Sequence, residues 1–153
     1  MRLTMRKAIQ WLDGFGKEVR NMKIEPPRQN DIGKLKPEFR KRLKEILIKM
    51  VERGFDPMVF ETIRTKRRQE YLFSIGRRGI KGEFKVTWTM NSAHISGYAA
   101  DIISNKEGWS NKTFFKVLYE VARKEGCFTL QRDRCHVQMD PQKEIDFGKP
   151  VKK

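Results

Sequence analysis

One stretch in the second half of the chain decides how the rest is interpreted: Ser92-Ala-His94-Ile-Ser-Gly97-Tyr-Ala99-Ala-Asp101. It holds one of only two histidines in the sequence, with an aspartate seven positions later. The other histidine follows an aspartate by three positions, in Asp133-Arg-Cys-His136-Val137. Two histidines and one aspartate would suffice for a catalytic zinc site, which commonly uses three protein ligands of these types. From spacing alone, however, such residues are more often ordinary polar or surface groups.

The residues around both histidines resemble the LAS metallopeptidases. Five fixed positions of the first stretch match the family pattern S-x-H-x-x-G-x-A-x-D, and the second stretch is similar to the family's acidic-x-x-His motif before an apolar residue. This family contains D-Ala-D-Ala peptidases, VanY-like D,D-carboxypeptidases and phage L-alanyl-D-glutamate endopeptidases. Weaker likeness covers about residues 37–140 and includes Ile63-Arg64-Thr65, Arg68-Gln69, Leu72, Gly76-Arg77 and Val86-Thr87.

The resemblance implies a metal site and a catalytic base. It makes His94, Asp101 and His136 the ligands of one Zn²⁺ ion. It makes Asp133 the general base that activates the attacking water, which is a role for an acidic group not bound to the metal. Gly97 is expected to supply a backbone conformation that brings His94 and Asp101 together.

Three further residues receive roles toward the substrate. Arg64 is similar to a family arginine that stabilises the developing oxyanion or holds a substrate carboxylate. Ser92 and Gln69 look like substrate-side or supporting hydrogen-bonding groups. Simpler interpretations stay open for each residue. Arg64 could be an ordinary charge at a strand end, Ser92 could cap a turn, and Gln69 could tie a helix to the sheet.

The two cysteines and two departures from the family pattern bear on the site. Cys135 adjoins His136, but neighbours in an extended strand point to opposite faces, so we expect it in the core or beside the ligands. Cys127 is expected in the core. Residues 126–131 lack the Trp- and Gly-rich loop of many members, and Gln138 stands where many have Glu. We expect these changes to affect the substrate cleft more than the metal.

Apolar periodicity and turn residues predict the order of elements. The expected helices cover 1–23, 37–53, 66–74 and 111–125, and the expected strands cover 57–64, 84–88, 99–103, 128–130 and 136–139. Strands that cluster late beside helices predict an α+β fold with a largely antiparallel sheet. The resemblance implies a hedgehog/D-Ala-D-Ala-peptidase-like domain. We expect a helix and linker over 1–33, the zinc peptidase domain over 34–142 and a flexible basic tail over 143–153.

The charge balance indicates an attraction to anionic surfaces in general and does not identify one partner. Lys and Arg number 34 against 19 Asp and Glu, which gives a formal net charge of +15. Such a field attracts polyanions, and anionic wall polymers or membrane surfaces fit the resemblance. No zinc finger, RNP motif or helix-turn-helix is visible, so no specific nucleic acid is expected. No signal peptide is visible either, and we expect a monomer made in the host cytoplasm that acts on the wall after release.

The leading hypothesis is zinc-dependent hydrolysis of peptidoglycan stem peptides, as an L-alanyl-D-glutamate endopeptidase of the phage endolysin type. The nearest alternative is a D,D-carboxypeptidase or dipeptidase with the same metal chemistry. A non-catalytic basic binding module is a third, motivated by the charge. Asp133 argues against that third reading, because a structural metal site needs no spare base.

Overall fold

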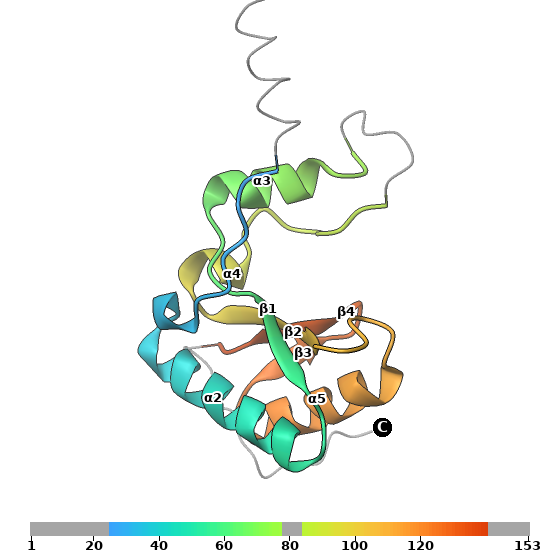
Figure 1. The fold of residues 1–153 in the computed structure, drawn as a ribbon. Coiled ribbons are helices and arrows are strands. Elements are labelled where there is room, and N and C mark those ends of the chain that lie inside the picture. The colour runs from blue at the N-terminus through green and yellow to red at the C-terminus, as the bar shows by residue number, and fades with distance from the viewer. Residues whose placement is uncertain (1–24, 78–83, 141–153) are drawn as a thin grey trace, which may run out of the picture.

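The computed structural model describes residues 25–77 and 84–140, which form a four-stranded antiparallel sheet with helices on both sides (Figure 1). The strand order in the sheet is β1-β2-β4-β3. The elements are η1 (Ile32–Lys34), α2 (Pro37–Glu52), β1 (Pro57–Glu61), α3 (Lys66–Ser74), α4 (Ala93–Ser96), β2 (Ala99–Ser104), α5 (Lys112–Lys124), β3 (Phe128–Leu130) and β4 (Asp133–Gln138). The predicted α+β class with an antiparallel sheet is confirmed.

The hydrophobic core lies between one face of the sheet and helices α2 and α5, which run along the bottom of the molecule in Figure 1. Apolar residues recur at helical spacing on both helices, and these stripes are buried against the sheet. From α2 and α5 they are Phe39, Leu43, Ile46, Met50, Phe114, Phe115, Leu118, Val121 and Ala122. Both helices end before a glycine with positive φ, Gly54 and Gly126, as the sequence predicted.

The register of the sheet aligns three polar residues on neighbouring strands. Glu61 on β1 pairs with Asp101 on β2, and Asp101 pairs with His136 on β4. Successive side chains of a strand point to opposite faces. Since Ala100 and Ile102 belong to the core, Asp101 between them faces the other side of the sheet.

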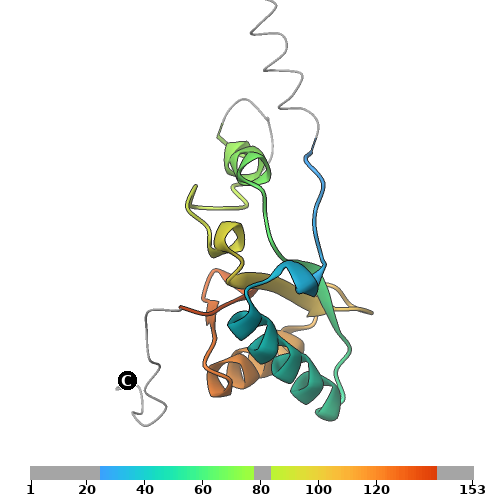
Figure 2. The ribbon, with the colours of Figure 1, turned by 90° about the vertical axis from the view of Figure 1, so that its left-hand side faces the viewer.

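The layer on that other side consists of α3, α4 and the segment 84–92, seen above the sheet in Figure 2. Helix α3 begins at the predicted place, where Thr65 accepts a hydrogen bond from the Arg68 backbone N–H at 3.1 Å. The short helix α4 was not predicted, because its four residues are too few for a periodic pattern.

The predicted strand over 84–88 is wrong. These residues lie outside every strand of the sheet, although their apolar side chains alternate as in a strand. No neighbouring strand pairs with them among the described residues; instead, the Gln69 amide nitrogen of α3 donates to Thr87 Oγ1 at 3.2 Å and to the Thr89 carbonyl at 2.6 Å. Two other boundaries differ by three residues: β1 stops at Glu61 rather than 64, and β4 begins at Asp133 rather than 136.

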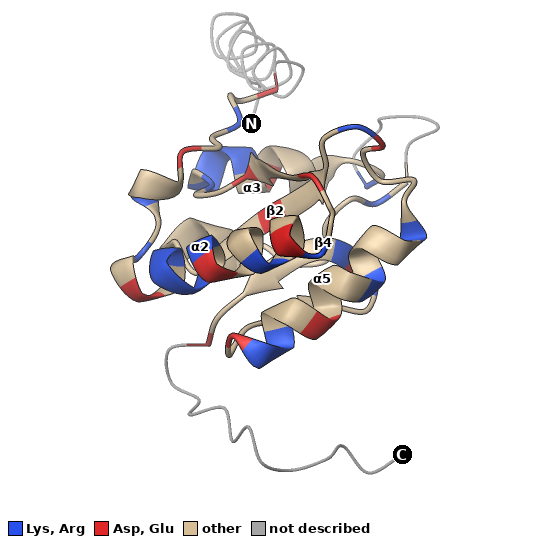
Figure 3. Cartoon of the chain, turned by 60° about the horizontal axis from the view of Figure 1, so that its bottom comes forward, with Lys and Arg blue, Asp and Glu red and all other residues tan. Residues whose placement is uncertain are grey.

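The N-terminal side of the described chain already contacts the domain. The Gln29 carbonyl accepts a hydrogen bond from the Thr62 N–H at 2.7 Å, and the Arg28 guanidinium lies 3.7 Å over the Phe60 ring. The predicted helix over 1–23 and the tail over 143–153 lie outside the described residues. Within residues 25–77 and 84–140, no helix is long and apolar enough to span a bilayer. Lys and Arg are spread over α2, α3 and α5 (Figure 3).

Truncating a core residue of α2 should destabilise the domain strongly. Leu43→Ala removes a fully buried side chain and leaves a cavity, so we expect unfolding free energy to fall by about 2–5 kcal/mol in urea titrations. Ile48→Ala on the same helix is the control, because Ile48 is 51% exposed and its loss should cost well under half as much. Equal losses for both variants would contradict the assignment of the core face.

Candidate metal centre

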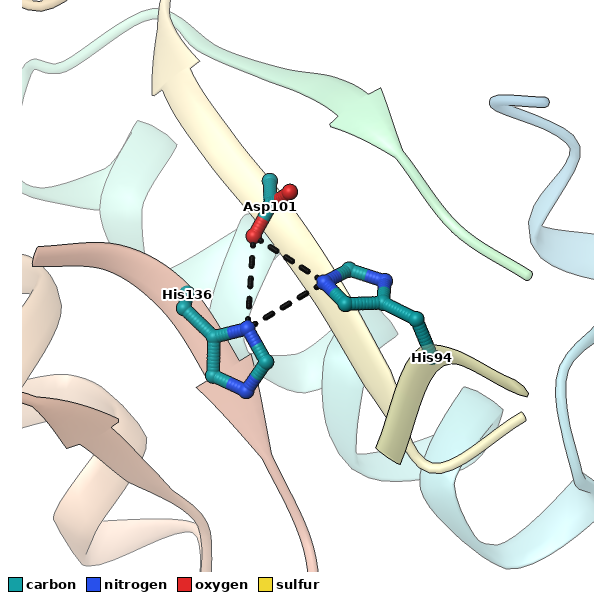
Figure 4. Close-up of side chains that lie close together, drawn as sticks. All are labelled: His94, Asp101 and His136. Atoms are coloured by element: carbon teal, nitrogen blue, oxygen red, sulfur yellow. Dashed lines mark hydrogen bonds and ion pairs between the residues drawn. The ribbon is translucent and has the colours of Figure 1, made fainter. Parts of the chain in front are cut away.

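Three side chains from three elements converge on the polar face of the sheet (Figure 4). His94 Nε2 from α4 lies 3.1 Å from His136 Nδ1 on β4 and 3.2 Å from Asp101 Oδ1 on β2. His136 Nδ1 lies 3.5 Å from the same Asp101 oxygen. All three side chains are buried. The structure therefore brings together the three residues that the sequence predicted as ligands.

The outer nitrogen of each imidazole fixes the protonation of the inner one. His94 Nδ1 lies 2.6 Å from the Thr62 carbonyl oxygen, which can only accept, so Nδ1 carries the hydrogen. His136 Nε2 likewise donates to the Gln138 amide oxygen at 2.7 Å. In the neutral rings, the inner nitrogens then present lone pairs, as the carboxylate does. Three acceptors face one another, and this arrangement calls for a cation between them.

The spacing of the three atoms fits zinc. Tetrahedral ligands about 2.0–2.1 Å from Zn²⁺ lie roughly 3.3–3.4 Å from one another, close to the three separations found here. Two imidazoles and one carboxylate are also a donor set that zinc accepts. Ligating histidines usually donate their other ring N–H to a carbonyl or carboxylate, as His94 does to Thr62. His94, Asp101 and His136 would hold the ion.

The electrostatics of the cluster favour a charged carboxylate. Burial opposes ionisation of Asp101. When no metal is bound and protons occupy the inner nitrogens, the hydrogen bonds from His136 and His94 outweigh burial and hold the pKa of Asp101 well below its usual range. Burial also opposes a charged His136, yet the hydrogen bond with Asp101 and its negative charge raise the pKa of His136 above the ordinary value. The carboxylate thus attracts a positive charge to this point, whether proton or metal.

The local sequence around α4 turns His94 toward Asp101. The Ser92 hydroxyl accepts a hydrogen bond from the His94 N–H at 3.3 Å and caps the helix. Gly97 ends the helix with φ of 81°, a conformation that glycine adopts without strain, which bears out the structural role predicted for it. The chain then reverses into β2. Ser92 also lines the cleft described below, so capping and a contact with substrate are compatible.

Arg64 approaches the cluster from the side of β1. Its Nη2 donates to Glu61 Oε2 at 2.6 Å and lies 3.5 Å from Asp101 Oδ2, while Nη1 donates to Gln69 Oε1 at 2.8 Å. Its Nε is buried without a partner among the described residues. The guanidinium therefore holds Asp101 in position while it bonds Glu61 and Gln69, and a contact with substrate stays a prediction.

Gln69 connects this arginine to the segment 84–92. It has no exposed surface, and its amide group bonds Arg64 on one side and Thr87 and Thr89 on the other. Every other predicted site residue lines the cleft, whereas Gln69 lies behind its wall. The geometry favours the interpretation in which Gln69 ties α3 to neighbouring segments, and its role toward the substrate stays a prediction.

Asp133 stands beside the cluster without joining it. One of its carboxylate oxygens lies within 4.8 Å of an Asp101 oxygen and of Cys135 Sγ. Burial, followed by the nearby charges of Asp101 and Asp133, raises the pKa of Cys135 far above its ordinary value, so the thiol stays protonated. Cys135 Sγ accordingly donates to Asp133 Oδ1 at 3.1 Å. Both cysteines are buried in the core cluster, as the sequence predicted.

The cluster lies in a cleft of about 1000 Å³ between the sheet and the layer of α3, α4 and segment 84–92. Its lining includes His94, Asp101, His136 and Asp133, together with two exposed tryptophans, Trp88 and Trp109. A cleft of this size lies at the upper end of the range for ligand pockets and has room for a short peptide.

Sequence reasoning missed three supporting residues. The Thr62 carbonyl and the Gln138 side chain hold the two histidines, and Glu61 bonds Arg64. Gln138 thus touches a predicted ligand directly, so its departure from the family pattern bears on the metal cluster, although we expected it to affect the substrate cleft more than the metal. The alternation of β4 offered a signal, because residues two apart on a strand share a face.

Comparisons with known proteins support the fold. No family model and no curated protein match the sequence. Among solved structures, the LdcB LD-carboxypeptidase, described with the molecular basis of peptidoglycan recognition, matches with a TM-score of 0.56 and 21% identity. This match covers 76% of the present chain and 65% of LdcB, which is less than two thirds of that protein.

A second match is the L-Ala D-Glu endopeptidase ChiX of Serratia marcescens, with a TM-score of 0.53 and 17% identity. It covers 76% of the present chain and 89% of ChiX. At these identities, the likeness shows a shared fold. The chain thus has a fold similar to that of two peptidases, a carboxypeptidase and an endopeptidase.

The cluster should bind one zinc ion. Isothermal titration of the metal-free chain with Zn²⁺ should give one site, and His94→Ala, Asp101→Asn or His136→Ala should weaken binding at least about 10-fold, because each removes a ligand. Asp133→Asn is the control and should retain the ion. Unchanged affinity in all three ligand variants would show that zinc binds elsewhere.

The buried carboxylate of Glu61 should be essential for stability. It pairs with both Arg64 and Arg68, and the three side chains are almost completely buried. Glu61→Gln leaves two buried cations short of their counter-charge, which should cost about 3–5 kcal/mol in urea unfolding. Glu120→Gln breaks an exposed pair with Arg53 and should change stability by less than about 1 kcal/mol. Similar small effects for both would contradict the account.

Proposed function

We propose that this chain is a zinc peptidase that hydrolyses peptide bonds in bacterial peptidoglycan stem peptides. The observation that carries the proposal is the convergence of His94 Nε2, His136 Nδ1 and Asp101 Oδ1 within 3.5 Å, with Asp133 beside them in a peptide-sized cleft. The fold shared with an LD-carboxypeptidase and an L-Ala D-Glu endopeptidase supports the substrate class.

Different residues of the chain have different roles in the proposed hydrolysis. Zinc, when bound, supplies a Lewis acid that polarises the scissile carbonyl and makes water more acidic. Asp133 takes a proton from the attacking water and delivers it to the leaving amine, as a general base and then a general acid. Cys135 donates a hydrogen bond to one Asp133 oxygen and thereby fixes the orientation of the carboxylate. Arg64 acts as a positioning residue, because it holds the second oxygen of Asp101.

Within this class, we propose an L-alanyl-D-glutamate endopeptidase of the phage endolysin type. The sequence motifs resemble that group, and ChiX has the same fold. Arg64 supports an endopeptidase, since its terminal nitrogens already bond Glu61, Gln69 and Asp101 rather than standing free for a terminal carboxylate. We further propose that the chain acts on the cell wall after release from the cytoplasm, and that its basic surface favours anionic wall polymers.

A carboxypeptidase is the second candidate, and the fold shared with LdcB favours it. It would use the same metal chemistry and differ in the bond cut. A non-catalytic basic binding module is the third, on account of the +15 charge. Salt-sensitive affinity for DNA comparable to that for peptidoglycan would favour this third candidate.

The test is digestion of purified peptidoglycan by the zinc-loaded chain, with products identified by mass spectrometry. New D-glutamate amino ends define the endopeptidase, and released D-alanine defines a carboxypeptidase. Asp133→Asn should lower the rate about 10²- to 10⁴-fold while retaining zinc, because it removes only the proton transfer. A folded, zinc-bound wild type that yields no products would refute the peptidase, and a fully active Asp133→Asn would refute the assigned base.

A further inference from the structure

A second chemical feature of the cleft centres on Trp88, in the segment that does not form the predicted strand. Gln69 ties this segment to α3 through Thr87 and Thr89. Four large apolar side chains of this segment are exposed: Phe84, Val86, Trp88 and Met90 have exposed fractions of 92%, 55%, 61% and 40%. Neighbouring large apolar side chains exposed in this way commonly mark a binding surface. Val86 and Trp88 line the same cleft as the metal cluster.

Three cations from three different segments surround the Trp88 ring. Lys85 Nζ lies 5.5 Å from the ring centroid, Arg132 Cζ lies 5.9 Å away and Arg77 Cζ lies 6.0 Å away. Arg77 is itself held in place, because it stacks 3.8 Å over Phe73 and donates to the Phe73 carbonyl at 2.6 Å. None of the three cations forms an ion pair with a carboxylate of residues 25–77 or 84–140.

Arg132 ties this group to the cleft, because Lys85, Trp88 and Arg132 all line it, whereas Arg77 is not among the lining residues. Arg132 comes from the β3–β4 turn, whereas Trp88 belongs to the opposite layer with α3, so their contact spans the cleft. A flat membrane surface would not enter such a space, but an extended chain would. The ligand that fits has an apolar C–H face for the indole and carboxylates for the surrounding cations.

We propose that Trp88, Lys85 and Arg132, with Arg77 beside the indole ring, form a subsite that binds a carboxylate-bearing segment of the stem peptide. This inference rests on the proposed function, and it adds the group that selects acidic over amidated peptides. Trp88 supplies contact area for either form of the ligand, while the cations distinguish a carboxylate from a carboxamide. Selectivity then falls as salt screens the charges.

The test uses two soluble stem peptides that differ only in a glutamate carboxylate or its carboxamide. Calorimetric titration of the full-length, zinc-loaded Asp133→Asn chain avoids turnover. The acidic peptide should bind several-fold more tightly than the amidated one. Adding Lys85→Gln or Arg132→Gln should each weaken the acidic peptide by about two- to fivefold and leave the amidated one little changed. Trp88→Ala should weaken both peptides.

Controls of matched chemistry lie away from the cleft. Lys44→Gln removes an exposed charge of α2, and Tyr119→Ala removes an exposed aromatic ring of α5; both should leave the selectivity unchanged. In the chain with Asp133 intact, Trp88→Ala should raise KM for the acidic peptide with little change in kcat. Lost selectivity in the control variants would indicate a general charge effect and overturn the subsite.

The outcomes separate this inference from the proposed function. If the unmodified chain cuts peptidoglycan but binds both peptides equally, the subsite is refuted and the peptidase stands. If no peptide is cut, but affinity depends on Trp88 and selectivity depends on Arg132, the subsite stands and the proposed peptidase activity is refuted. If Trp88→Ala loses affinity for anionic phospholipid vesicles and none for the peptides, the surface is a membrane contact and the inference is overturned.

Discussion

Three hydrogen-bond acceptors meet on the polar face of the sheet, and much of the neighbouring structure holds them there. His94 is fixed by the Thr62 carbonyl, His136 by the Gln138 amide and Asp101 by Arg64. Without a positive charge between them, the converging lone pairs would repel one another. The free energy of metal binding would then offset the cost of holding the acceptors together, so binding and local folding are coupled.

One buried carboxylate, that of Glu61, balances the positive charges of the two arginines next to the three acceptors. Glu61 pairs with Asp101 across the β1–β2 register and bonds both Arg64 and Arg68. Arg68 extends the network to Glu25 at 2.8 Å and to the Pro26 carbonyl at 2.7 Å. The segment preceding η1 is thus anchored through the same ion pairs that orient Asp101. A buried network of this kind stabilises only while every member keeps its partner.

The sequence predicted those features whose signal is local. The apolar stripes of α2 and α5 gave both helices close to their observed bounds, and the motifs gave three residues that the structure brings together. The strand over 84–88 was predicted wrongly. Alternating apolar residues indicate which side chains would share a face of a strand, but they do not show that a partner strand is present. The contacts of Glu61 and Thr62 were missed because they depend on long-range register. The roles of Arg64 and Gln69 toward the substrate stay predictions.

We infer that His94, Asp101 and His136 bind one zinc ion and that Asp133 and Cys135 are not among its ligands. X-ray absorption at the zinc edge of the loaded chain tests this directly. We predict two imidazole nitrogens and only oxygen besides, at about 2.0–2.2 Å, and the loss of one imidazole in His136→Ala. A sulfur ligand at about 2.3 Å would place Cys135 on the metal and contradict the account.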